Sequence, residues 1–413
     1  MRINTLFKFL IGDRQALLTI ANTPHAIWFA LAFVITGGLS RNYDKEPLLH
    51  APEHVFGPLI VSGLIGTGLF LLIRFATNSL LTVTGPVVRP FIVFMTLYWM
   101  TAPMAWLYGI PTERMTDIVT ATELNLWTLA LVSLWRVLLI ARVASVIFGA
   151  PMWMMSVLVL AFSNVLVVAV LVATPFPIIN IMGGVGLSQS EQLISGIATS
   201  TFILSHLTIP VLVLTSVILV AVMKGTWQVP NLPREERPQL HRSVTALAIG
   251  SLAFWLALLP LTQPAQSLRY ETENALIRGD IPAGIALMTE HGREAFPPHW
   301  EPPPRRLYGE TTPDVLDVLE HLLAHPHADA WIVDQYAEKL GQSLRRWRNS
   351  YDVVRIASIA QRLPQGPRLL WEARWSLRHL WQSETDEAAV QVLRNIARDY
   401  AIAHDLEWDE RSY

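Results

Sequence analysis

The sequence predicts an all-α protein in which a polytopic membrane bundle of about seven spans, or six if the first apolar segment does not cross, precedes a soluble, helical-repeat-like domain. The chain is 52% hydrophobic and only 15% charged, whereas soluble domains are about 25% charged. Residues 1–263 hold 14 Lys+Arg and 10 Asp+Glu, and residues 264–413 hold 17 and 23. This shift predicts an interfacial segment over 1–25, a membrane bundle over 26–263 and a C-terminal domain over 264–413.

The first 25 residues combine apolar positions at helical spacing with interspersed charges. Such a pattern is typical of an amphipathic helix that lies on a membrane surface. The alternative is a helix packed on the protein's own loops. The apolar positions are Ile3, Leu6, Phe7, Leu10, Leu17 and Ile20, and the charged ones are Arg2, Lys8, Asp13 and Arg14.

Seven apolar segments are candidates for crossing a membrane, which takes about 20 residues of helix. The first segment has only about 15 residues, so it either crosses with the bundle or lies in the interface. The candidate spans are Ala26–Ser40, Val55–Ala76, Val87–Ile110, Leu126–Phe148, Met152–Ala173, Thr199–Met223 and Val244–Leu261.

The distribution of basic residues predicts the orientation, because cytoplasmic loops are enriched in Lys and Arg. With the N-terminus in the cytoplasm, the outer flanks carry only Arg41, Lys45 and Arg114. An odd number of spans then places residues 264–413 outside the cytoplasm, and we expect a multi-pass protein of a bacterial inner membrane. The inner flanks carry Arg2, Lys8, Arg14, Arg74, Arg89, Lys224, Arg234, Arg237 and Arg242.

Two arginines lie within the fourth candidate span. Arg142 is about six residues from the inner end of this helix, so its side chain can extend to the interface. Arg136 is about ten residues from either end, and an arginine at that depth is expected to face the bundle interior, a partner or a water-filled cavity. The two lie about 120° apart around the helix, so they do not form one stripe.

The sequence offers Glu191, His206 and the neutral Asn164 of the fifth span as partners of Arg136. Glu191 is the acid of the apolar connection between the fifth and sixth spans, which is apolar enough to dip back into the membrane, and His206 lies inside the sixth span. We therefore predict an intramembrane polar network or ligand site of Arg136, Glu191, His206 and Arg142. The alternative is that Arg136 bonds backbone carbonyls and hydroxyls and only holds the bundle together.

Motifs for catalysis, metal binding or cofactor binding are weak in this chain. The sequence contains no cysteine, which excludes thiolate ligands and nucleophiles. His50–His54 reads HAPEH and matches an inverted zincin motif, but Pro52 is expected to begin a helix and to leave His50 outside it. We predict no metal, no cofactor and no catalytic residue, and an enzyme is the least favoured class.

The C-terminal domain is predicted to consist of paired helices. A Pro-rich strap at 295–305 separates the first pair from the rest. It either spaces or wraps the domain, or it presents Trp300, Arg305, Arg306 and Tyr308 to a partner. Nucleic acid is not expected, because the domain is acidic overall. The predicted helices cover 266–278, 281–291, 313–325, 328–361, 367–382 and 384–405.

These features favour a membrane-anchored interaction or assembly protein, which contacts the lipid bilayer and binds a protein partner through residues 264–413. The alternative is a transporter or channel for a small solute, with an anion among the candidates, that uses Arg136 in the bundle.

Overall fold

The computed structural model describes residues 1–78, 88–173, 189–222, 241–304, 313–325, 327–345, 352–377 and 387–408. Every regular element in these ranges is a helix, which confirms the predicted all-α class. Contacts divide the described chain into a first unit that ends at Pro264 and a second unit that begins at Ala265. Each unit has its own hydrophobic core.

The first unit begins with two short helices, α1 (Ile3–Leu10) and α2 (Arg14–Asn22). The Asp13 carboxylate accepts a hydrogen bond from the Ala16 amide at 2.8 Å and so caps the start of α2. The inward apolar side chains are buried in the bundle core, whereas others on α1 are exposed. Leu6, Phe9, Leu17 and Ile20 are buried, and Ile3 and Phe7 are exposed.

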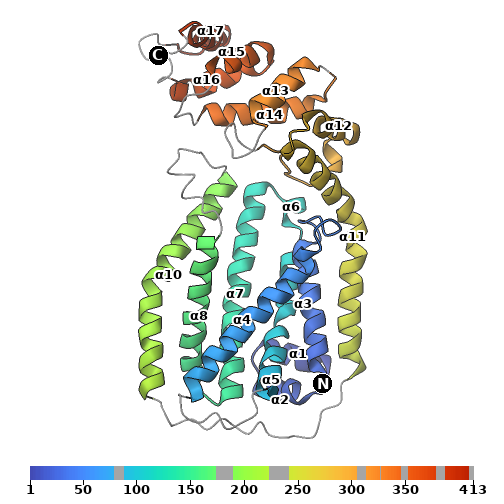
Figure 1. The fold of residues 1–413 in the computed structure, drawn as a ribbon, viewed down its shortest axis with the longest axis vertical. Helices are drawn as coiled ribbons and strands as arrows, with labels where there is room; N and C mark the ends of the chain where they lie inside the picture. The colour runs from blue at the N-terminus through green and yellow to red at the C-terminus, as the bar shows by residue number, and fades with distance from the viewer. Residues whose placement is uncertain are drawn as a thin grey trace. The chain divides into compact units, whose positions relative to one another are not determined.

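Six helical segments are long and apolar enough to cross a membrane, and the bent pair α2 and α3 (Ala26–Asn42) would make a seventh. The helix direction bends by 109° between the two members of this pair. The third span is interrupted and consists of α5, the 3₁₀-helix η1 and α6. The segments, shown in Figure 1, are α4 (Glu53–Asn78), α5 (Val88–Trp99), η1 (Ala102–Gly109), α6 (Thr112–Met115), α7 (Ile118–Phe148), α8 (Met152–Ala173), α10 (Gln189–Val222) and α11 (Arg242–Ile277).

Helix α3 packs closely between α4 and the third span because it has two adjacent glycines. A Cβ atom on Gly38 would lie 2.8 Å from the Val55 carbonyl oxygen of α4. A Cβ atom on Gly37 would lie 3.4 Å from the Ala102 carbonyl oxygen of η1. Small residues at such crossings let membrane helices approach each other closely.

Helices α7 and α8 form an antiparallel hairpin through a very short turn. Gly149 ends α7 with a positive φ of 68°, a conformation that glycine adopts without strain. The Ser145 hydroxyl donates a hydrogen bond to the Ala150 carbonyl at 2.6 Å. Pro151 directly precedes α8, which fits the preference of proline for helix starts.

Three boundaries differ from the predicted ones. The third span is not one helix, since α5 ends at Trp99. Helix α10 begins at Gln189, so Glu191 lies in its first turn rather than in a re-entrant loop. Residues 174–188 lie outside the described residues. Helix α11 continues through Pro264 to Ile277. It therefore includes the residues for which we expected a separate helix after residue 266.

The second unit is built from short amphipathic helices that pack against one another. Contacts join α13 to α14, α14 to α16, and α17 to both α15 and α16. The predicted long helix over 328–361 is two helices, α14 and α15. The elements are α12 (Ile281–His291), η2 (Arg293–Ala295), α13 (Val315–Ala324), α14 (Ala330–Leu344), α15 (Val353–Arg362), α16 (Gly366–Leu377) and α17 (Glu387–Ala403).

The described part of the proline segment is fastened to α14. The Tyr336 hydroxyl donates to the Pro303 carbonyl at 2.6 Å. The buried Lys339 ammonium donates to the carbonyls of Pro302 and Pro304. Proline has no N–H to donate, but its carbonyl oxygen still accepts hydrogen bonds. A proline-rich segment is therefore held by donors from neighbouring residues.

Candidate functional site: the break in the third membrane span

The third span breaks where proline interrupts it. Pro103 has no N–H, and in a continued α-helix its ring would clash with the carbonyl four residues earlier, that of Trp99. Helix α5 ends at Trp99, and the chain resumes as η1 with Pro103 in its first turn. We call residues 100–109 the span break. Non-helical backbone at membrane depth needs donors and acceptors from the protein around it.

A face of α3 supplies several of those donors. The Ser40 hydroxyl donates to the Ala105 carbonyl at 3.2 Å, and the Tyr43 hydroxyl donates to the Gly109 carbonyl at 3.0 Å. The Thr36 hydroxyl oxygen accepts from the Trp106 indole N–H at 3.1 Å. Residues 36, 40 and 43 share one helix face by their spacing. The span break is therefore anchored along α3.

Arg136 approaches the break from α7. It lies on the inward stripe of this helix, in helical register with the buried residues Val132, Leu139 and Val143. It is about 27 Å along the helix from Ile118 and about 18 Å from Phe148. The side chain is thus near the middle of a 31-residue span, where an arginine is costly unless it is paired.

Arg136 contacts two residues at the C-terminal end of α5. Its Nε–H donates to the Thr101 hydroxyl oxygen at 3.1 Å. Its guanidinium carbon lies 5.4 Å from the centre of the Tyr98 ring, within the range of a cation–π interaction. The negative end of the α5 dipole favours a cation at this place. Within the described residues, the two terminal nitrogens of Arg136 have no hydrogen-bond acceptor.

This arrangement can bind an anion. A guanidinium presents its terminal N–H groups as a planar fork that matches a carboxylate or phosphate. Thr101 is fully buried and Tyr98 is 5% exposed, so the site has a low local dielectric, which strengthens such contacts.

Arg142 has a different role. Its Nε–H donates to the Gly12 carbonyl at 3.1 Å, in the turn between α1 and α2. The turn needs a glycine because the φ of Gly12 is +78° and a Cβ atom there would lie 3.2 Å from Cγ of Arg142. Arg142 thus fastens the N-terminal helices to α7, away from the span break.

The structure does not bring Arg136 and His206 together. His206 is exposed on α10, where its Nδ1 lies 2.9 Å from the Phe202 carbonyl oxygen of the same helix and its ring contacts the Phe202 ring. Glu191 lies in the first turn of α10. Arg136 instead joins Thr101 and Tyr98, which were not among its predicted partners. Pro103 was the available signal, since a proline inside an apolar span indicates a break.

The residues predicted to meet a partner are placed as follows. Trp300 is 6% exposed and belongs to the core of the second unit. Its ring stacks on Phe296 at 4.2 Å, and its indole N–H donates to Glu273 at 2.7 Å. Its ring is therefore used inside the unit. Arg305, Arg306 and Tyr308 lie outside the described residues.

Ion pairs gather at the end of α3. Arg114 pairs with Asp44, and Lys45 pairs with Glu113 at 3.0 Å.

At the HAPEH motif, α4 includes His54 but begins at Glu53, after His50. The described residues contain no group of three or more metal-ligating side chains.

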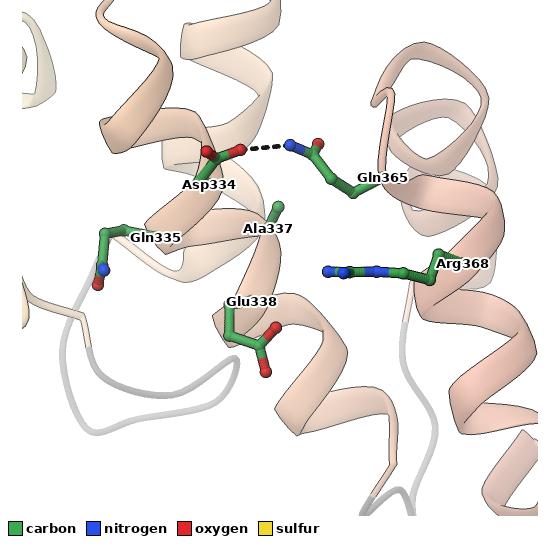
Figure 2. A pocket seen from close by; sticks show the side chains of 6 residues that line it. All are labelled: Asp334, Gln335, Ala337, Glu338, Gln365 and Arg368. Atoms are coloured by element: carbon green, nitrogen blue, oxygen red, sulfur yellow. Dashed lines mark hydrogen bonds between the residues drawn. The ribbon is translucent and has the colours of Figure 1, made fainter.

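A shallow groove of about 460 Å³ lies between α14 and α16 in the second unit. Figure 2 shows the Asp334 carboxylate of α14 accepting a hydrogen bond from Gln365, with Arg368 reaching toward α14 below them. Glu338 in this groove pairs with Arg345 at 2.8 Å. The acidic groups of the groove are therefore already paired.

The fold and its apolar helices define a polytopic α-helical membrane protein. No family model, no curated protein and no solved structure matches the chain.

Proposed function

We propose that the bundle is a transporter or channel that binds a small anionic solute at Arg136. The single observation that supports this proposal best is the guanidinium at the span break, which uses one N–H on Thr101 and leaves its terminal nitrogens without an acceptor among the described residues. Broken helices near the bilayer midplane are where many transporters place their substrate sites. A fixed cation there favours a carboxylate or phosphate group.

The first test is anion-dependent stability in nanodiscs of phosphatidylcholine, a lipid without net charge. We expect acetate, phosphate or sulfate, compared at constant ionic strength, to raise the melting temperature of the wild-type protein. A solute at ten times its Kd stabilises by about 1.4 kcal/mol. Arg136→Gln is expected to lose this rise. Arg142→Gln is the matched control, because it removes a guanidinium from the same helix and leaves the span break unchanged.

Two results would contradict the proposal. If no anion stabilises the wild-type protein while Arg136→Gln lowers its melting temperature, Arg136 only holds the helices together. If Arg136→Gln keeps the full anion response, the anion binds elsewhere. Flux of the stabilising anion into proteoliposomes, compared between the same variants, then distinguishes transport from binding alone.

We also propose that the protein lies in a bacterial inner membrane with its C-terminal region outside the cytoplasm. The excess of basic residues on the inner flanks supports this orientation. A reporter that is active only outside the cytoplasm is fused after Tyr413 and, separately, after Lys224. Activity at Tyr413 and silence at Lys224 are expected, and the reverse pattern would invert the orientation.

A second candidate function is protein binding by the C-terminal region, as a soluble domain of repeat-like helix pairs. The groove between α14 and α16 supports this candidate, because its polar side chains offer hydrogen-bonding groups to a peptide segment. A photo-crosslinking residue at Gln335, in the groove, is expected to capture a partner that the same residue at exposed Gln361 does not. Loss of this adduct in Arg368→Glu would place the partner in the groove, and equal capture at both positions would not support it.

A further inference from the structure

We propose that the α1–α2 hairpin is a docking surface for anionic phospholipid headgroups, which hold it against α7. This inference concerns a surface distant from the span break and is independent of the anion site at Arg136.

The hairpin is fixed to the bundle through its turn. The Trp135 indole N–H donates to the Leu10 carbonyl at 2.8 Å, and Arg142 donates to the Gly12 carbonyl at 3.1 Å. Residues 135 and 142 lie two helical turns apart on one face of α7, so both side chains can hydrogen-bond to the loop between α1 and α2. At the N-terminus, the Met1 carbonyl accepts from the His241 amide just before α11 at 3.0 Å.

These attachments place the hairpin at the level of the membrane surface. Arg142 is about 9 Å along the helix from Phe148, the last residue of α7, and His241 directly precedes Arg242, the first residue of α11. Both helices end within the headgroup region if their apolar stretches fill the hydrocarbon core. The hairpin therefore lies where lipid headgroups meet acyl chains.

The apolar face of α1 is only partly covered by the bundle. Leu6 and Phe9 face the core and are buried. On the adjoining side of the same helix, Ile3, Phe7 and Ile11 follow each other at intervals of four residues and are 36%, 64% and 76% exposed. This stripe fits insertion into the acyl boundary, the position that amphipathic interfacial helices occupy.

Basic side chains surround this stripe and lack acidic partners. Arg2, Lys8 and Arg14 are exposed and form no ion pair within the described residues. The one acid of the hairpin, Asp13, accepts from the Ala16 amide as a helix cap. At the other end of the bundle, by contrast, Lys45 and Arg114 are paired with acids. A cationic rim around an apolar stripe is complementary to an anionic lipid surface.

The test uses the full chain in nanodiscs of pure phosphatidylcholine or of phosphatidylcholine with 30% phosphatidylglycerol, about the range in which surface charge acts strongly. Hydrogen exchange of the α1–α2 amides reports docking. We expect phosphatidylglycerol to raise the protection of these amides about fivefold for each cation that contacts a headgroup. Salt at about 0.5 M should remove most of the effect because it shortens the Debye length to about 4 Å.

The triple variant Arg2→Gln, Lys8→Gln, Arg14→Gln should show equal protection in both lipid compositions. Arg41→Gln, which removes an exposed cation elsewhere in the first unit, should keep the phosphatidylglycerol effect. Equal protection of the wild-type hairpin in both compositions would overturn the proposal, as would an undiminished lipid effect in the triple variant. Protection by added poly-glutamate without protection by phosphatidylglycerol would overturn it in favour of an acidic protein partner.

Discussion

The two arginines of α7 show how six residues of separation change the role of one side chain. Arg136 is on the inward stripe and contacts Tyr98 and Thr101 at the span break. Arg142 lies on the face shared with Trp135 and holds the α1–α2 turn. Their depths and the angle between them could be predicted from helical geometry. Their partners could not, because Thr101 and Gly12 are distant in sequence and reach α7 only through tertiary packing.

Lys339, together with Tyr336, holds the strap of the second unit. Lys339 is 4% exposed and donates to the carbonyls of Pro302 and Pro304. Lys339→Met keeps the stem but leaves buried carbonyls without a donor, which costs about 1–3 kcal/mol for each group. We expect faster hydrogen exchange at the Trp300 amide, which is bonded to the Pro297 carbonyl. The exposed change Gln361→Met is the control, and unchanged exchange in Lys339→Met would show that other contacts hold the strap.

The stability of the second unit is predicted to depend on pH through His321. Burial, and then the neighbouring His325, lower the pKa of His321 below its ordinary value of 6.5. The two rings stack at 4.3 Å. A lowered pKa means that the folded state disfavours the charged ring, so its stabilising contribution is complete above pH 6.5 and is lost as the pH falls.

Hydrogen exchange of the α13 amides therefore should quicken between about pH 7 and pH 5, beyond the intrinsic pH effect on exchange. His321→Gln should remove most of this extra change because its side chain does not titrate. The same pH response in both proteins would assign it to another group.

At the scale of elements, the lengths of the apolar segments predicted the positions of the spans well. They did not predict where the helical backbone is interrupted within a span. Helices α4 and α8 lie close to their predicted ranges, because a run of apolar residues between polar ends leaves few alternatives. The third span was expected to be continuous, and it breaks at Pro103. The donors that make this break tolerable, Ser40 and Tyr43, come from a different helix. Only their common face on α3 could be read from the sequence.

The α3–α4 crossing is predicted to be intolerant of even one methyl group. Gly38→Ala places a Cβ atom 2.8 Å from the Val55 carbonyl oxygen, so the helices must separate. We expect a loss of about 1–3 kcal/mol, measured as a lower melting temperature in detergent. Gly57→Ala is the matched control on α4, because its Cβ atom would meet nothing within 4 Å. A similar effect of both substitutions would mean that crowding at the crossing is not the cause.

For the whole molecule, the open question of six or seven crossings depends on the bent pair α2–α3. Helix α3 has 17 residues, which is about 25 Å, against a hydrocarbon core of about 30 Å. If α3 crosses, Lys8 and Leu49 lie on opposite sides of the membrane. If it turns back, they lie on the same side.

The chain contains no cysteine, so a single introduced thiol reports its own side without background. Both positions are exposed. With α3 crossing, as we expect, an impermeant maleimide should label Leu49→Cys in intact cells and Lys8→Cys only after permeabilisation. Labelling of both positions under the same condition would show that α3 does not cross.

The depth of Arg136 has an electrical consequence. It lies about two-fifths of the way along α7 from Phe148, so an ion that binds there has passed through part of the membrane potential. Moving one charge through the whole potential is worth about 2.3 kcal/mol per 100 mV, and two-fifths of it, about 0.9 kcal/mol, corresponds to about a fivefold change in affinity. An anion held at the span break would therefore be drawn in or expelled by voltage, with the sign set by the side from which it enters.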